Sequence, residues 1–210
     1  MKITRLVASV LAVLVFAPMV AFAQEGSLMI RARGVYISTA DKSDAIPALS
    51  VPADAITVSK KLIPEVDITY FFNKNLAAEL VLTYPQKHDV EVAGTKIGTF
   101  KHLPPVLSLQ YHFSPEGMVR PYIGVGANLT IISDVKLAVP GVGALDLEDT
   151  SVGMSGQAGF DIKLSPKVFL NADLKYVALR SDVMLKAGGT KVSLVKVDPW
   201  LIGVGFGYRF

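Results

Sequence analysis

The side chains best suited to chemistry in this sequence are three histidines, a few hydroxyl groups and a set of carboxylates. Ser108 and His112 share one face of a candidate strand, an arrangement that a hydrolase or a lipid-modifying enzyme could use. Because a strand rises about 3.3 Å per residue, the four-residue spacing places them roughly 13 Å apart. That distance is too long for the imidazole to activate the hydroxyl, so we predict no catalytic site and no enzymatic function.

The other two histidines raise the question of a metal site. His88 and His102 flank a long connection between candidate strands and could pair across its neck. A metal site needs further converging ligands at characteristic spacings, and the chain has no cysteine and no third ligand at such a spacing. The glycine-rich stretches do not open helices and do not form phosphate-binding loops. We therefore predict no metal and no cofactor.

Charged residues of both signs alternate with other side chains along several candidate strands. The carboxylates and the basic residues that point the same way are Glu65, Asp67, Glu79, Asp161, Asp173, Arg31, Arg33, Lys163 and Arg209. They resemble acid–base machinery, but charges of both signs in a narrow enclosure more often neutralise each other, because unpaired buried charge is costly. We expect a structural network.

The elements that carry these residues are strands with two different faces. In the last stretch, 200–210, large apolar residues alternate with glycines and Arg209. Similar alternation occurs in seven earlier stretches, 28–37, 62–72, 76–84, 103–113, 122–131, 151–163 and 168–176. After residue 23 no apolar run is long enough for a transmembrane helix. The pattern predicts an all-β fold, an eight-stranded antiparallel transmembrane β-barrel surrounded by outer-membrane lipid.

A secreted eight-stranded sandwich would also show alternation. It would gain nothing from tyrosine and phenylalanine rings gathered at strand ends, which favour a barrel with aromatic girdles. The connections also alternate in length. Those at 73–75, 114–117 and 165–167 are tight, and those near 38–61, 85–102, 133–150 and 180–197 are long. This asymmetry predicts short periplasmic turns, long outer loops and two periplasmic termini.

The first residues have the features of an export signal. A basic start, an apolar run and the ending Ala21-Phe22-Ala23 predict a cleavable signal peptide at 1–23, with a retained helical anchor as the alternative. The barrel domain is then 24–210. Loss of Lys2 and Arg5 leaves 19 basic and 18 acidic residues, so we expect no nucleic-acid partner.

Three stretches resemble a known family. Residues 101–113 (KHLPPVLSLQYHF), 120–128 (RPYIGVGAN) and the ending with Asp198-Pro199-Trp200 and Gly207–Phe210 are similar to motifs of the OmpW family of outer-membrane proteins, in the family's order. The resemblance implies an eight-stranded barrel with a narrow channel for small, mostly hydrophobic molecules, in a family with relatives that assist alkane uptake. It also implies that Phe210 is an assembly signal read by the outer-membrane assembly machinery.

Strand direction gives each inward residue a height in the lumen. Charged residues gather near the periplasmic end, and apolar ones near the outer end, where we predict a solute pocket of Val35, Ile37, Ile63, Val81, Val106, Val177 and Leu201. Pro104 and Pro105 cannot donate to a ladder and predict a lateral opening. The expected function is passive uptake of small hydrophobic solutes, which leave sideways into the bilayer. The alternative is a structural or adhesive barrel that acts through its loops.

Overall fold

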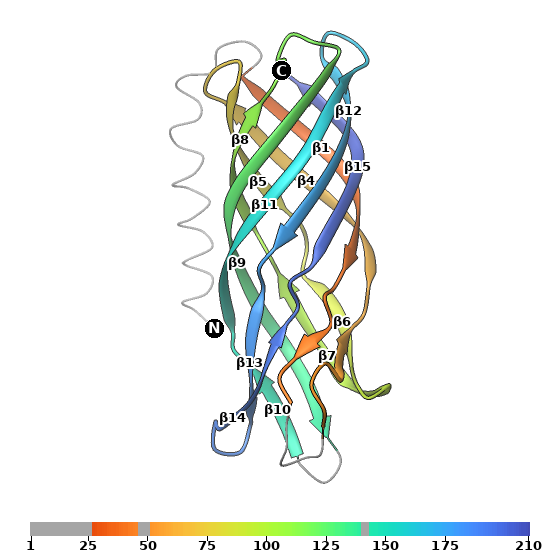
Figure 1. The fold of residues 1–210 in the computed structure, drawn as a ribbon, viewed down its shortest axis with the longest axis vertical. Helices are drawn as coiled ribbons and strands as arrows, with labels where there is room; N and C mark the ends of the chain where they lie inside the picture. The colour runs from red at the N-terminus through yellow and green to blue at the C-terminus, as the bar shows by residue number, and fades with distance from the viewer. Residues whose placement is uncertain (1–26, 46–50, 140–142) are drawn as a thin grey trace.

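Eight strands close into an antiparallel barrel, as the sequence predicts (Figure 1). The computed structural model describes residues 27–45, 51–139 and 143–210, so the predicted signal peptide at 1–23 lies outside the described residues. The barrel strands are β1 (Leu28–Ser38), β4 (Lys61–Phe71), β5 (Leu76–Leu82), β8 (Val106–His112), β9 (Val119–Val139), β11 (Thr150–Lys163), β12 (Val168–Val177) and β15 (Trp200–Arg209). They pair in this order, and β15 returns to β1.

The outer face of the barrel is apolar, which is the reverse of a water-soluble sheet. Leu62, Val125, Val152 and Met154 are among the most exposed side chains of the described chain. Aromatic pairs lie at the end with the tight turns, which we call the turn end; Tyr208 and Phe210 stack there edge-on at 4.9 Å. Tyr36, Tyr84 and Trp200 are exposed at the opposite border. An apolar band between two aromatic girdles is the surface of a strand barrel in lipid. No helix of the described ranges is long and apolar enough to cross a membrane.

Glycines on the inner face of β15 make room for arginines of β1. Gly207 pairs with Arg31 and Gly205 with Arg33 in the β1–β15 ladder. A Cβ added at Gly207 would lie 3.0 Å from Arg31 Cγ, and one added at Gly203 would lie 3.4 Å from Arg33 Cδ. At Gly205 the close neighbour is backbone, because an added Cβ would lie 2.0 Å from the carbonyl oxygen of Ala32. The alternation of glycine with large residues therefore serves both faces: lipid contact outside and space for long basic side chains inside.

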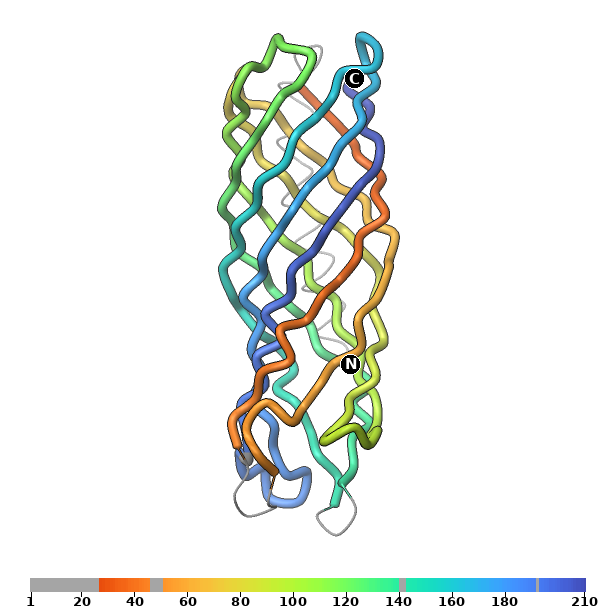
Figure 2. Tube along the Cα trace, turned by 45° about the vertical axis from the view of Figure 1, so that its right-hand side comes forward, coloured from red at the N-terminus to blue at the C-terminus, as the bar shows by residue number. Residues whose placement is uncertain are grey.

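The four long connections fold into further strands that continue the barrel beyond the apolar band (Figure 2). These strands are β2 (Lys42–Ser43), β3 (Ile56–Val58), β6 (Gln86–Val92), β7 (Thr95–Leu103), β10 (Gly143–Leu147), β13 (Arg180–Leu185) and β14 (Lys191–Lys196). Together with residues 132–139 of β9 we call them the extension. Their pairing runs β2–β14–β13–β10–β9–β7–β6–β3. The two ends of this series are joined where Ser43 N donates to Asp54 Oδ1 at 3.1 Å.

A β-bulge reverses the two faces of β9 where it leaves the apolar band. Even-numbered residues face inward up to Ile132, but Leu137 is the buried residue of the upper part. Asp134 lies between them at a φ of 50°, and the β7–β9 register shifts at this point. One extra residue exchanges the faces of a strand. Asp134 and Lys136 are thereby exposed outside the extension, while Leu137 packs inside it.

The predicted strand 103–113 is two strands in the structure. Leu103 ends β7 and Val106 begins β8, with Pro104 and Pro105 between them outside any strand. Proline has no N–H to give to a ladder, so two in succession end the pairing. The interruption lies at the border between the apolar band and the extension.

Candidate functional site

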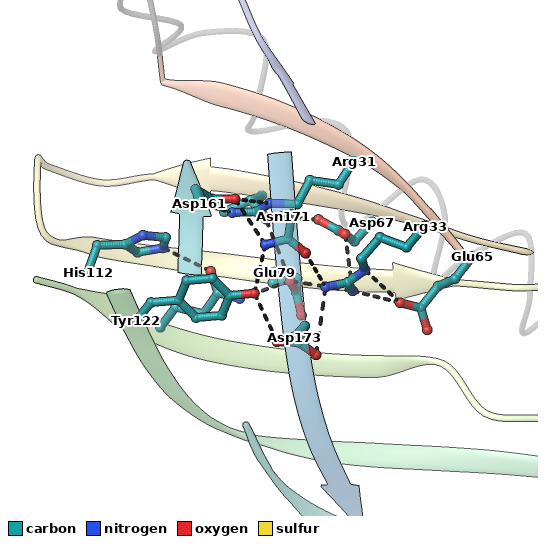
Figure 3. A network of polar contacts seen from close by, with 12 residues as sticks. Arg31, Arg33, Glu65, Asp67, Glu79, His112, Tyr122, Asp161, Asn171 and Asp173 are labelled. Atoms are coloured by element: carbon teal, nitrogen blue, oxygen red, sulfur yellow. Dashed lines mark hydrogen bonds and ion pairs between the residues drawn. The ribbon is translucent and has the colours of Figure 1, made fainter. Parts of the chain in front are cut away.

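The half of the lumen nearest the turn end is filled by a charged network, which we call the plug (Figure 3). Arg31 is completely buried; its Nη1 donates to Asp67 Oδ1 at 3.0 Å and its Nη2 to Asp161 Oδ2 at 2.8 Å. Its Nη1 also donates to Thr69 Oγ1 at 2.6 Å. One arginine therefore joins β1, β4 and β11 across the lumen.

A second layer of the plug lies closer to the extension. Arg33 Nη2 lies 2.6 Å from Glu65 Oε1 and 3.1 Å from Asp67 Oδ2. Lys175 Nζ donates to Glu79 Oε1 at 2.9 Å, and both side chains are almost fully buried. Every charge of this layer has an opposite charge in contact, which lowers the large cost of removing it from water.

Neutral polar side chains complete the plug. Tyr122 donates its hydroxyl to Asp173 Oδ2 at 2.9 Å, and Gln110 Nε2 donates to Glu79 Oε2 at 2.9 Å. Seven barrel strands contribute a side chain to the network, and β15 contributes the glycines that make space for it. An apolar solute passing this way would have to separate buried ion pairs, which is strongly unfavourable.

The network predicted from the sequence forms, but three basic residues, Lys163, Arg209 and Lys175, differ from the prediction. Lys163 is exposed at the turn end instead of enclosed in the lumen. Arg209 lies with its guanidinium carbon 4.0 Å from the centre of the Phe71 ring, below the network. Lys175 is the buried cation that sequence reasoning left out, although it shares a strand face with Asp173. Strand parity was the signal that could have found it.

Above the plug, the predicted pocket residues surround a small apolar cavity that we call the neck pocket. Six of the seven line it, namely Ile37, Ile63, Val81, Val106, Val177 and Leu201. Val35 is buried directly beside it, in one cluster with Ile37 and Ile63. Pro104 also lines the neck pocket, so one of the two prolines proposed for a lateral opening faces the lumen.

The extension encloses a second cavity, the extension pocket, whose walls are almost entirely apolar. It is lined among others by Val58, Phe100, Leu137, Leu147 and Val195. Leu179 and Val197 line both pockets, so the two cavities share a wall. Apolar surface therefore extends from the extension to the top of the plug.

Both pockets are narrow in this structure. The cavity volume is about 50 Å³ for the extension pocket and about 30 Å³ for the neck pocket. A water molecule requires on the order of 10–15 Å³ on the same scale. A medium-chain solute would therefore fit only if apolar side chains of the walls changed rotamer.

The backbone ladder is interrupted beside the neck pocket, along a line that we call the seam. The last β4–β5 pair is Val66 with Leu82, and the last β5–β8 pair is Val81 with Val106. Pairing resumes only in the extension, with Gln86 opposite His102. Between these points, residues 83–85 and 104–105 belong to no strand. The seam is thus held by few backbone hydrogen bonds at the height of the neck pocket.

The histidines take positions that the sequence only partly anticipated. His88 and His102 pair as considered, their rings stacked at 4.7 Å in the neck pocket, and no described residues form a group of three potential metal ligands. His112 Nε2 lies 3.0 Å from Gln110 Oε1. Ser108 Oγ is buried without a hydrogen-bond partner.

Sequence reasoning missed the part of the site that β6 and β7 supply. Residues 86–102 were expected to be a loop, yet Gln86, His88, Val90 and Phe100 are buried. The signal was present: in 86–92 these residues alternate with Lys87, Asp89 and Glu91, which is the period-2 pattern of a strand with one wet face. A charged outer face is typical of a sheet in water, so the stretch 86–92 does not match the pattern of a membrane-spanning strand.

Comparisons with known proteins match almost the whole chain. The model of the OmpW family matches residues 24–210. The chain is 38% identical over 189 residues to the uncharacterized outer-membrane protein y4mB of Sinorhizobium fredii, covering 86% of this chain and 79% of that protein. It is 32% identical to outer membrane protein W of Vibrio cholerae, with all of both chains covered. The crystal structure of outer membrane protein OprG from Pseudomonas aeruginosa matches with a TM-score of 0.74 and 30% identity, over 89% of this chain and 97% of that one.

Proposed function

The chain belongs to the OmpW family, and from this premise we propose that it is an outer-membrane barrel for passive uptake of small hydrophobic molecules. The observation that carries the proposal is the lumen, which is apolar from the extension to the neck pocket and charged below. Solutes enter through the extension, where dehydrating an apolar molecule is favourable because the walls are apolar. No energy source is required, since the solute moves down its own concentration gradient.

The exit is lateral, through the seam. A solute that reaches the neck pocket has the plug beneath it and the seam beside it. Leaving through the seam requires residues 83–85 to move away both from Pro64 of β4 and from residues 104–105, with few ladder hydrogen bonds to break. The lipid outside is as apolar as the pocket, so the transfer has no large barrier from desolvation. Pro104 and Pro105 therefore weaken the wall at the height where the solute stops.

The alternative, a structural or adhesive barrel that works through its loops, has less support. Its working parts would be the long connections, and these fold into the extension with an apolar interior. A surface used only for adhesion has no need of a continuous apolar lumen. We therefore place the function inside the barrel and not on its outer rim.

The orientation and the assembly route form part of the proposal. We propose that the turn end faces the periplasm, because short turns lie on that side of outer-membrane barrels and long connections on the other. The start of β1 and the end of β15 lie together at the turn end, where Phe210 N donates to Leu28 O at 2.9 Å. We propose that the assembly machinery of the outer membrane reads the exposed terminal Phe210. A chain ending at Arg209 is expected to insert poorly; normal insertion would contradict this role.

Uptake of labelled n-octane tests the function. The protein is placed in vesicles with a lipopolysaccharide outer leaflet, and accumulation is compared with protein-free vesicles and with a polar solute of similar size. The proposal expects faster octane uptake and unchanged uptake of the polar solute. Equal octane uptake with and without protein would overturn it.

A reversible cross-link tests the exit separately. The chain has no cysteine, and Thr83 Oγ1 donates to Pro64 O at 3.4 Å across the seam. Thr83→Cys with Pro64→Cys, joined by a short reducible bifunctional thiol reagent, is expected to slow octane uptake until the link is reduced. The matched control joins Leu107→Cys with Ala127→Cys, which are paired in the continuous β8–β9 ladder. Unchanged uptake in the linked Thr83–Pro64 protein would exclude this exit.

A further inference from the structure

Most of the wall of the neck pocket above the plug is apolar, but one side of it is polar. Gln86 and His88 of β6 and His102 of β7 line the pocket and are buried. Gln86 and His102 are directly paired across the two strands, and the rings of His88 and His102 stack at 4.7 Å. We call these three side chains the polar wall. None of them belongs to the plug.

The polar wall holds three buried atoms without a hydrogen-bond partner: Gln86 Oε1, His88 Nε2 and His102 Nδ1. Two of them can be assigned as acceptors. Gln86 Nε2 donates to Tyr84 O at 3.0 Å, which leaves the amide oxygen unpaired. His88 Nδ1 lies 2.8 Å from the carbonyl oxygen of Ser59, so Nδ1 carries the proton and Nε2 of the neutral ring has a free lone pair.

Buried polar atoms without partners are uncommon in proteins, because each forfeits its hydrogen bonds to water. Here the two residues that carry these acceptors line a cavity that the proposed solute route crosses. The other polar side chains at the pocket already have partners, as Lys175 does with Glu79. The unused hydrogen-bonding capacity of the pocket is therefore concentrated in the polar wall.

The two rings are neutral at physiological pH. Burial lowers the pKa of His88, and it lowers the pKa of His102 to about 3, with the neighbouring His88 and Lys61 acting in the same direction. A neutral stacked pair offers no charge to a carboxylate. Stacked rings also do not converge on one point, as ligands of a metal ion must.

We propose that the neck pocket selects apolar molecules that carry one hydrogen-bond donor, a hydroxyl group, such as medium-chain alcohols or phenols. This inference rests on the proposed uptake function and names its substrate class. The hydroxyl donates to Gln86 Oε1 or His88 Nε2, and the hydrocarbon part lies against Val81, Val106 and Leu201. A charged ammonium is disfavoured because the walls of the extension pocket are apolar apart from Ser181 and offer it no carboxylate.

Uptake of 1-octanol, n-octane and octanoate measured in the same vesicles tests the inference. After subtraction of protein-free uptake, the wild type is expected to favour octanol over octane and to exclude octanoate. Gln86→Met and His88→Phe keep the approximate volume and remove the acceptor, and should each lower the octanol-to-octane ratio roughly three- to tenfold. Ser181→Ala, which removes an unpaired hydroxyl from the extension pocket, should leave the ratio unchanged.

The outcomes separate the two proposals. Octane uptake with an octanol-to-octane ratio that neither wall variant changes would overturn the inference and leave the uptake function standing; the wall would then bind water only. Absence of protein-dependent uptake of all three solutes would overturn the uptake function, and the substrate class with it.

A measurement on the wild type is independent of whether the variants fold. With ¹⁵N-labelled histidine, 1-octanol should shift the Nε2 signal of His88, and n-octane should not. His112 lies on the other side of the plug and already contacts Gln110, so its signal is the internal control. Equal responses to octanol and octane would contradict the inference.

Discussion

The plug and the extension are two equally buried regions of one lumen with opposite chemistry. Arg31, Asp67 and Glu79 are completely buried in the first, and Val183, Leu137 and Leu147 are buried in the second. The difference follows the surroundings of the strands. Where lipid lies outside, the apolar residues face outward and polar ones fill the lumen. Where water lies outside, the exposed residues include Lys87, and the apolar ones fill the lumen.

The proposed solute route depends on this change in which face of the strands is apolar. In the extension the charged residues face outward and the apolar residues pack in the interior. In β9 the reversal is visible as the bulge at Asp134. The neck pocket lies at the border between the plug and the extension. Its lining is largely apolar, and the charged plug lies beneath it.

The largest expected effect comes from breaking the plug. Arg31→Met leaves Asp67 and Asp161 as buried carboxylates without their main partner. We expect a loss of about 3–5 kcal/mol in the free energy of unfolding, measured by urea unfolding in detergent micelles. Lys74→Met removes a cation whose partner, Glu116, is exposed, and should cost far less because water screens that pair. Similar losses in the two variants would show that the plug does not stabilise the barrel.

A charge on the lipid face should have the next largest effect. Leu107 is exposed on β8 within the apolar band. Leu107→Lys places an ammonium in lipid and should destabilise the barrel by about 2–4 kcal/mol near the midplane. Urea unfolding in a phosphatidylcholine bilayer measures it. A loss below about 1 kcal/mol, the value for positions near the interface, would mean that Leu107 lies outside the hydrocarbon layer.

In the lower half of this comparison both the strands and the charged network could be predicted from the sequence. In the upper half the sequence marks a strand such as 86–92 but not how the strands assemble. Alternation over ten or more residues identifies strands such as β15. The direction of each strand then gives the position of an inward residue, such as Arg31 or Val81, along the lumen. The plug follows because inward charges in a narrow barrel must pair. The extension strands are shorter, β3 having three residues, and their faces are interrupted by a bulge. Parity is local information and cannot say that strands from four connections meet around one apolar core.

A smaller effect on stability is expected from the two histidines of the polar wall when the pH is lowered. His88 and His102 have folded-state pKa values below the ordinary value of 6.5, because burial disfavours the charged ring. The unfolded chain therefore binds more protons below pH 6.5, and the stabilisation present above that pH is lost as the pH falls, for His102 down to about 3. The loss approaches about 1.4 kcal/mol per histidine for each pH unit.

The measurement is the change in urea midpoint between pH 7 and pH 5, in the wild type and in a variant with His88→Phe and His102→Phe. Carboxylates of the plug titrate in both proteins, so the difference between the two isolates the histidines. The account expects a smaller pH dependence in the variant. Equal pH dependence would mean that the rings are accessible to water and titrate normally.

Octane uptake by Val81→Lys separates a function of the lumen from a function of the outer rim. Val81 is buried in the neck pocket beside the seam, so the substitution places an ammonium where the solute must lie, and the lipid face is unchanged. The account predicts a folded barrel, shown by a heat-dependent shift in detergent gels, with octane uptake reduced at least about tenfold. Val81→Met, of similar length without charge, should retain most of the uptake. Undiminished octane uptake by folded Val81→Lys would contradict the account and favour a function carried by the outer rim of the barrel.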